Sequence, residues 1–281
     1  MKNSLLDKNS NEAVQLLRFR FAGILDDVMT GNDEETKLAD FLTSEGVLRW
    51  VKRRIYCMAS AYVDGFIRHE VLPSKYPHAP TEAPPNQDEP DVLHIPEVLI
   101  RCLQFYDQSL MELAPTRSFK YSGKVRVGGR SNVAVPRESV YDTECMRILS
   151  NWLSRYDWTV TGHWHLQGPS RAHRYTDIVY RKGSKKPIVL ELLATSDKAF
   201  VQSHIDKFPE YMSLLSAAEG WVIHFTCEDN YTPLWQADAL LAKRLNVMHI
   251  SHDLTFKHLS VKAQWKDIKG VKKYYTRNLE L

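Results

Sequence analysis

Two acidic residues stand in runs that are otherwise typical of buried strands. Asp177 lies in the run YTDIV (residues 175–179), and Glu191 lies in the run IVLELL (residues 188–193). Because an unpaired charge in a low-dielectric interior is costly, a buried acid must be paired, protonated or bound to a metal ion. Carboxylates that converge on a hard cation such as Mg²⁺ hold it together with waters that can become nucleophiles. The two acids therefore predict a hydrolytic metal site, with a strand-end ion pair to Arg174 or a nearby lysine as the alternative.

The surrounding residues predict the elements that would position these acids. A polar turn that contains Gly183 (residues 181–186) would join the two runs as a hairpin. Helices are predicted over residues 139–156 and 197–215, the second bent at Pro209, because apolar residues recur there at helical spacing. Further strands are predicted over residues 158–166, 221–226 and 247–250, and a further helix over residues 236–245. This order predicts an α/β domain with a mixed sheet and helices on both faces.

Four segments carry a resemblance to a known family. They are VTGHWHL (residues 160–166), RYTDIV (174–179), LELLAT (190–195) and HFTCED (224–229). Together they resemble the C-terminal nuclease-like domain of Crinkler-type effector proteins of oomycetes and fungi, which has the PD-(D/E)XK (restriction-endonuclease-like) fold. The resemblance covers residues 138–266 and leaves the N-terminal region unaccounted for. It implies an effector or toxin-like nuclease, located in a nucleus, that uses Mg²⁺ or Mn²⁺ and a metal-activated water to cleave DNA, with RNA as a second possible substrate.

The same resemblance assigns roles to individual residues. Asp177 and Glu191 become catalytic metal ligands, and Glu144 on the first predicted helix becomes the third acid. Glu144 shares a helical stripe with Ile148, so it can point toward the sheet. The alternative for Glu144 is an exposed glutamate near a helix start, where the helix dipole favours a negative charge.

One position departs from the family pattern. Leu193 stands two residues after Glu191, where the superfamily has a lysine, and an apolar side chain cannot stabilise transition-state charge. We expect a catalytic lysine from the following helix instead, Lys207 first and Lys198 second, since His204 and Lys207 lie on one helical face. The alternatives are an exposed helical lysine and, for the whole domain, an inactive nuclease-fold module that binds nucleic acid or a protein partner.

Composition restricts the setting of the protein without identifying its partner. The chain has 281 residues and a formal net charge of +3, which is too small to indicate a nucleic-acid binder by itself. Basic residues nevertheless cluster at residues 52–54, 124–130 and 262–277. No apolar stretch is long enough to cross a membrane, and the four cysteines are far apart, which predicts a soluble intracellular protein in a reducing compartment.

The histidines and glycines exclude two further classes of site. His163 and His165 alternate on one predicted strand, but no HExxH pattern accompanies them, so we expect structural or phosphate-proximal roles rather than zinc binding. The glycines of residues 120–136 are not followed by the Lys-Ser/Thr ending of a Walker A loop, which argues against NTP hydrolysis.

Three regions are predicted along the chain. Residues 1–115 are expected to be mainly helical, a possible surface for a protein partner, because apolar residues such as Leu48, Val51, Ile55 and Met58 follow helical spacing. Within this region, six prolines make residues 72–91 a linker or long loop. Residues 116–137 form a flexible basic connection, and residues 138–281 form the nuclease-like domain with a basic C-terminal tail.

Overall fold

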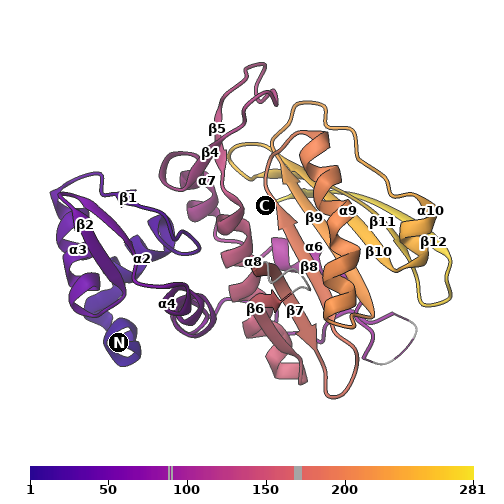
Figure 1. The fold of residues 1–281 in the computed structure, drawn as a ribbon, viewed down its shortest axis with the longest axis horizontal. Helices are drawn as coiled ribbons and strands as arrows, with labels where there is room; N and C mark the ends of the chain where they lie inside the picture. The colour runs from indigo at the N-terminus through magenta and orange to yellow at the C-terminus, as the bar shows by residue number, and fades with distance from the viewer. Residues whose placement is uncertain (88, 90, 168–172) are drawn as a thin grey trace. The chain divides into compact units, whose positions relative to one another are not determined.

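The chain divides into two compact units, Met1–His78 and Ala79–Leu281, and each is described by itself. The structure is a computed structural model that describes residues 1–87, 89, 91–167 and 173–281, with the side chains of residues 163–176 left out of the description (Figure 1). The boundary expected near residue 115 lies inside the larger unit. In the described part of the chain, no helix is both long enough and apolar enough to span a bilayer.

The smaller unit combines helices with a three-stranded antiparallel sheet of order β1-β3-β2. Residues 48–58 form a β-hairpin, so the helix predicted there is wrong. Arg54 adopts a left-handed φ of 58° in the turn, and the β-branched residues Val51 and Ile55 favour strands. The helices are α1 (Lys2–Leu6), a 3₁₀ turn (Lys8–Ser10), α2 (Asn11–Arg20), α3 (Asp33–Ser44), α4 (Ala61–Phe66), a π-helical turn (Ile67–Val71) and α5 (Leu72–Lys75), and the strands are β1 (Val28–Met29), β2 (Leu48–Lys52) and β3 (Ile55–Met58).

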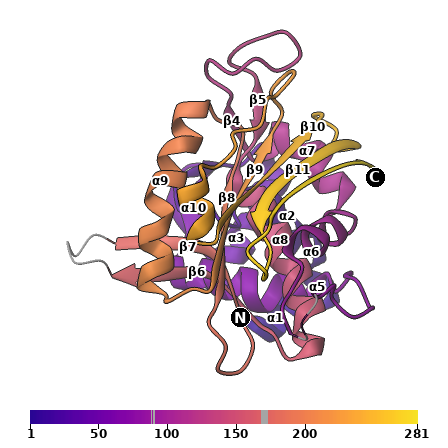
Figure 2. The same cartoon turned by 90° about the vertical axis from the view of Figure 1, so that its right-hand side faces the viewer.

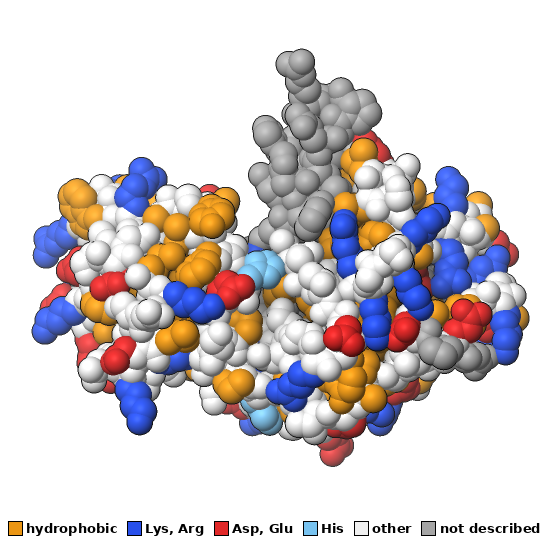
Figure 3. Space-filling view, turned by 90° about the horizontal axis from the view of Figure 1, so that it is seen from below, with side chains coloured by type: hydrophobic (Ala, Val, Ile, Leu, Met, Phe, Trp, Pro, Cys, Tyr) orange, Lys and Arg blue, Asp and Glu red, His pale blue; other side chains and the backbone are white. Residues whose placement is uncertain are grey.

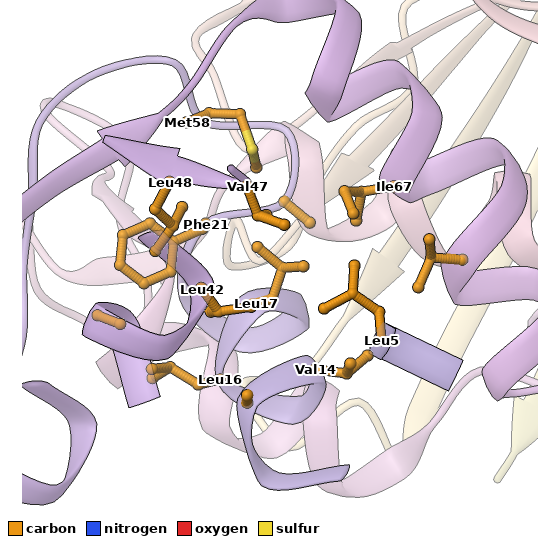
Figure 4. Close-up of a cluster of buried hydrophobic side chains, with 14 of the residues drawn as sticks. Leu5, Val14, Leu16, Leu17, Phe21, Leu42, Val47, Leu48, Met58 and Ile67 are labelled. Carbon is orange, nitrogen blue, oxygen red and sulfur yellow. The ribbon is translucent and has the colours of Figure 1, made fainter. Parts of the chain in front are cut away.

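The smaller unit has its own hydrophobic core. Leu17 and Phe21 of α2, Leu42 of α3, Leu48 of β2 and Met58 of β3 are buried in one cluster (Figure 4). Removal of their apolar surface from water is the main favourable contribution to folding of such a unit. Because the smaller unit has a hydrophobic core of its own, it is a domain and not a helical extension of the larger unit.

The larger unit contains a seven-stranded mixed sheet of order β12-β11-β10-β9-β8-β7-β6. β8, β9 and β10 run parallel to one another, and all other neighbours are antiparallel. The α/β prediction with a mixed sheet is therefore confirmed. The strands are β6 (Thr159–Gln167), β7 (His173–Arg181), β8 (Ile188–Leu193), β9 (Glu219–Thr226), β10 (Leu245–His252), β11 (His258–Lys266) and β12 (Lys272–Glu280).

Strands β11 and β12 replace the basic tail that the sequence suggested. Several of their cations are paired with acids: Lys272 Nζ lies 2.9 Å from Asp238 Oδ1, and Lys273 Nζ lies 3.5 Å from Asp267 Oδ2. Charged side chains on an edge strand such as β12 also discourage pairing with another chain. On the face of the molecule drawn in Figure 3, Lys and Arg side chains are similarly interspersed with Asp and Glu.

Helices cover both faces of the larger sheet, as Figure 2 shows. On one face, Val201 and Ile205 of α9 pack against Val189 of β8. On the other face, Cys102 of α6 and Cys145 of α8 line an apolar cavity together with sheet residues that include Leu192 and Ile223. The helices are α6 (Ile95–Leu103), α7 (Gln108–Arg117), α8 (Glu138–Leu153), a 3₁₀ turn (Ser154–Tyr156), α9 (Lys198–Leu214) and α10 (Asp238–Ala242).

Two segments expected to be irregular are ordered in the part that the structure describes. The proline-rich segment begins as α5 in the smaller unit, so the prediction of a loop is wrong for residues 72–75, and from Ala79 it makes defined contacts in the larger unit. The proline-rich segment is held against the end of α8, because Trp152 Nε1 donates a 2.7 Å hydrogen bond to the Glu82 carbonyl and the Tyr156 hydroxyl donates one to Thr81. The basic connection forms a two-stranded antiparallel hairpin of β4 (Phe119–Tyr121) and β5 (Ala134–Pro136), not a flexible crossing. This hairpin brings Lys120 to the end of β8, where its Nζ lies 3.1 Å from Ser196 Oγ.

We expect Gly220→Ala to destabilise the larger unit by about 1 to 3 kcal/mol through overpacking. A Cβ at Gly220 in β9 would lie 2.5 Å from Met212 Sδ and 2.7 Å from Phe208 Cε1 of α9. Denaturant unfolding measures the effect. The control is Gly65→Ala in α4, where a Cβ meets no described atom within 4 Å and should be neutral or slightly stabilising. Equal stabilities of the Gly220→Ala variant and the unmodified protein would contradict this packing.

Candidate active site

Asp177 and Glu191 lie on neighbouring antiparallel strands, as the predicted hairpin requires. Asp177 is in β7 and Glu191 is in β8. Because side chains alternate along a strand, Asp177 faces the same side as Val179, and Glu191 faces the same side as Leu193. Val179 and Leu193 both belong to the core that packs against α9. The two acids therefore project from the same face of the sheet.

Asp177 is fixed close to the point where β7 and β8 stop pairing. The ladder joins Ile178 to Leu190, and Asp177 Oδ2 then accepts a 2.6 Å hydrogen bond from the backbone N–H of Leu192. Every buried backbone donor needs an acceptor, and here a side chain supplies it. The carboxylate is consequently held beside β8.

Two acids from the start of α8 complete a group of four carboxylates. Glu138 and Asp142 are four residues apart and therefore lie on one stripe of the helix. Burial raises the pKa of Asp177 well above its usual range, and the charges of Glu191, Asp142 and Glu138 raise it further. Burial and the charge of Glu191 raise the pKa of Glu138 to about 7. We call Glu138, Asp142, Asp177 and Glu191 the acidic cluster.

Two basic side chains adjoin the acidic cluster. His204 Nδ1 of α9 lies 3.1 Å from Glu191 Oε1, in agreement with the helical face predicted to reach the sheet. Lys120 of β4 donates to Ser196 Oγ at 3.1 Å and to the Ala194 carbonyl at 3.4 Å, just beyond the end of β8. Burial lowers the pKa of Lys120, and its charge in turn lowers the pKa of Glu138. The cluster thus combines acids with a histidine and a half-buried lysine.

Glu144, the predicted third acid, lies elsewhere. Its carboxylate pairs with Arg147 Nη2 at 2.8 Å and accepts the backbone N–H of Asp107 at 3.1 Å. At 3.6 residues per turn, Glu144 is rotated by roughly 200° from Asp142 around the helix axis. Glu138 and Asp142 therefore occupy the place that the sequence analysis gave to Glu144. The i, i+4 pair of acids at the helix start was the signal that could have identified them.

The two predicted lysines are not held against the acids as Lys120 is. Lys207 lies on the exposed side of α9, and Lys198 is exposed at the start of α9, where its charge acts on Glu228. Leu193 is buried among the apolar side chains of α9. Lys120 was missed because residues 120–136 were interpreted as a flexible connection.

Three histidines of the sheet, His224, His249 and His252, are buried, and burial favours their neutral forms, whereas His258 is exposed and lies 2.7 Å from Asp253 Oδ2. Burial lowers the pKa of His224 to about 3 and that of His249 to about 4. The Tyr231 hydroxyl lies 3.0 Å from His249 Nδ1 and 3.3 Å from His224 Nδ1. The side chains of His163, His165 and Arg174 lie outside the described residues.

The acidic cluster has the chemistry of a divalent-cation site. Carboxylate oxygens are the ligands that Mg²⁺ and Mn²⁺ prefer, and Glu191 Oε2 is buried without a hydrogen-bond partner among the described residues. Within the same described part, no three His, Cys, Asp or Glu side chains are already arranged around one ion position. The donor set fits a hard cation, and binding would require the carboxylates to draw together.

Neither a family model, nor a curated protein, nor a solved structure matches this chain. The interpretation of the site therefore depends on its own residues. Their arrangement places four mutually repelling acids, one histidine and one lysine at the end of two paired strands.

Glu138→Gln should stabilise the protein at pH 8 in EDTA by roughly 1 to 2 kcal/mol. The pKa of Glu138 is raised from 4.5 to about 7 in the folded protein, so folding favours its protonated form. Below pH 4.5 the group is protonated in both states and costs nothing, and the free energy of unfolding falls as the pH rises from 4.5 through 7. The gain should therefore vanish near pH 4.5. Denaturant unfolding at the two pH values measures this difference.

Glu144→Gln is the matched comparison on the same helix. This substitution leaves the charge of Arg147 buried without its partner and should destabilise the protein by about 3 kcal/mol or more. A Glu138→Gln variant that loses stability at pH 8 in the same way would show that Glu138 does not belong to a repelling cluster.

Proposed function

We propose that the acidic cluster is the active site of a divalent-metal-dependent nuclease that cleaves DNA phosphodiesters. The observation that carries the proposal is the meeting of Asp177 and Glu191, from paired strands, with Glu138 and Asp142 in one buried, mutually repelling group. Perturbed pKa values in such a group are typical of catalytic sites. The proposal includes a restriction-endonuclease-like fold for the larger unit, which its mixed sheet between helices supports.

Three carboxylates would hold the cation. Asp177 and Glu191 supply ligands from the strands, and Asp142 supplies a third from α8. When bound, Mg²⁺ or Mn²⁺ supplies Lewis-acid polarisation of the phosphodiester and a more acidic water. Neutralisation of the repulsion within the cluster would contribute to its affinity.

The remaining residues have roles in proton transfer and charge stabilisation. Glu138 is half-buried with a pKa of about 7, so it can accept the proton that the attacking water loses. The water oxygen would then bond to phosphorus, the bond from phosphorus to the leaving sugar oxygen would break, and that oxygen would take up a proton from solvent water. His204 orients Glu191 through their 3.1 Å contact. The ammonium of Lys120 stabilises negative charge on the non-bridging oxygens.

Lys120 would supply the catalytic cation that Leu193 cannot provide. The strand position two residues after Glu191 is occupied by an apolar side chain that α9 buries, so a cation must come from another element. Lys120 comes from β4 and reaches the end of β8, where it contacts Ser196. The alternative function is a module with the same fold that binds nucleic acid or a protein without cleaving, and the buried Leu193 favours that alternative.

Plasmid nicking with Mg²⁺ or Mn²⁺ tests the hydrolytic activity. The intact protein should nick DNA, EDTA should abolish nicking, and Glu191→Gln or Asp177→Asn should lower the rate by about a thousandfold or more, since each removes a cation ligand. Glu210→Gln, an exposed change on α9, is the control and should retain the full rate. Nicking that persists in both ligand variants would place the active site elsewhere.

Lys120→Ala should lower kcat by about a hundredfold, because a positioned cation contributes several kcal/mol to transition-state stabilisation. Lys120→Arg should restore part of the rate, and Lys207→Ala should leave the rate unchanged because Lys207 is exposed. Steady-state nicking rates measure both effects. A loss in Lys207→Ala with none in Lys120→Ala would return the catalytic role to Lys207. DNA binding without any metal-dependent cleavage by the intact protein would establish the non-catalytic module.

A further inference from the structure

A cleft of about 500 Å³ lies beside the β4–β5 hairpin in the larger unit. It is formed by the loop of the hairpin, the start of α9 and the residues that follow β9. We call it the hairpin cleft. Its lining includes three cations and three acids: Lys124, Arg126, Lys198, Asp197, Glu228 and Asp229.

Two of the three acids are engaged with backbone amides. Asp229 accepts hydrogen bonds from the N–H groups of Gly128 at 2.8 Å and Gly129 at 2.7 Å. Asp197 caps α9 by accepting the N–H of Phe200 at 2.9 Å. Gly128 and Gly129 have φ values of 57° and 75°, a left-handed conformation that suits glycine, so the loop is shaped to meet Asp229. These acids therefore stabilise the walls of the cleft.

The three cations keep their charges available. Lys124, Arg126 and Lys198 are exposed, and no described carboxylate forms an ion pair with them within 4.0 Å. Other basic groups differ in this respect, because Lys182 Nζ lies 2.6 Å from Asp91 Oδ1 and Lys272 is paired as described above. The cleft therefore brings together three cations that form no close ion pair with a described carboxylate, whereas two of its three acids are already engaged with backbone amides.

The same two segments of the chain, the β4–β5 hairpin and the residues that lead into α9, contribute to both the acidic cluster and the hairpin cleft. Lys120, which acts on Glu138, is four residues before Lys124 on the same hairpin. Its contact with Ser196 places it next to the segment that leads into Asp197 and Lys198. Cations thus extend from the acidic cluster along the hairpin into the cleft.

We infer that the hairpin cleft binds phosphates of a nucleic-acid strand next to the phosphate at the acidic cluster. Phosphate contacts position a nucleic acid without reading its sequence, and lysine and arginine are their usual donors. The inference rests on the proposed function for the identity of the ligand, and it makes the substrate a polynucleotide that spans several phosphates. The volume of the cleft is within the range of about 300 to 1,000 Å³ typical of ligand sites.

The test is binding of a fluorescein-labelled 20-base-pair DNA duplex in EDTA, measured by anisotropy from low to physiological salt. The double variant Lys124→Ala/Arg126→Ala should bind at least tenfold more weakly. The salt dependence of its binding should become weaker: the negative slope of log K against log salt should become shallower by about 2, because each lost phosphate contact removes about 0.9 from its magnitude. Lys243→Ala, an exposed lysine outside the cleft, is the matched control and should bind like the intact protein.

A second variant moves the affinity in the opposite direction. Glu228→Gln removes the negative charge of Glu228, whose Oε2 has no hydrogen-bond partner among the described residues. Because this charge repels phosphates, its removal should tighten binding several-fold. A purely structural role for Glu228 would not produce this gain. Lys124 and Arg126 are exposed and Glu228 is half-buried, and their neighbours Val125 and Cys227 belong to a small core, so circular dichroism melts check that both variants fold.

The outcomes separate the cleft from the chemistry. Binding by the double variant equal to that of the intact protein, equal loss in Lys243→Ala, or no binding by the intact protein at low salt would overturn the cleft. Because EDTA prevents cleavage, the binding assay does not depend on catalysis. An intact protein that binds through the cleft in EDTA but does not cut DNA with Mg²⁺ or Mn²⁺ overturns only the proposed nuclease. An RNA duplex of the same length, run in parallel, identifies which polymer carries the phosphates.

Discussion

Burial of like charges is the constraint on which the candidate site depends. Four carboxylates share one region of the larger unit, where burial and the neighbouring negative charges raise the pKa values of Glu138, Asp177 and Glu191. The fold offsets this cost locally, since Leu192 donates its backbone N–H to Asp177 and His204 contacts Glu191. Such an arrangement costs stability when its members are charged, and the proposed cation would offset that cost.

The helix α8 carries acids in two different environments. Glu144 is neutralised by Arg147 and ties the helix to the backbone at Asp107, so it serves the fold. Glu138 and Asp142, on another side of the helix, meet the charges of the strand acids. One helix therefore provides a buried ion pair on one side and two members of the acidic cluster on another, and the position of each acid around the helix axis decides which it joins.

The β4–β5 hairpin and α9 link the acidic cluster to the hairpin cleft. The hairpin contributes Lys120 to the cluster and Lys124 and Arg126 to the cleft, while α9 contributes His204 and Lys198 in the same order. A change in the position of either element would alter both places together. A chain of modest net charge can therefore offer a local group of cations, while other basic residues, such as Lys272 and Lys273 of β12, are paired with acids.

The sequence by itself determined the α/β class, the mixed sheet and the place of Asp177 and Glu191 on adjacent strands. Those features follow from local periodicity and from acids set in apolar runs, which neighbouring residues reveal. Only the tertiary structure decided that Glu138 and Asp142 rather than Glu144 meet the strand acids, and that Lys120 reaches a carbonyl 74 residues away. Helix rotation and long-range contacts are set by packing against the sheet. The i, i+4 spacing of Glu138 and Asp142 shows that they share one stripe of the helix, but it does not show that this stripe faces the strand acids.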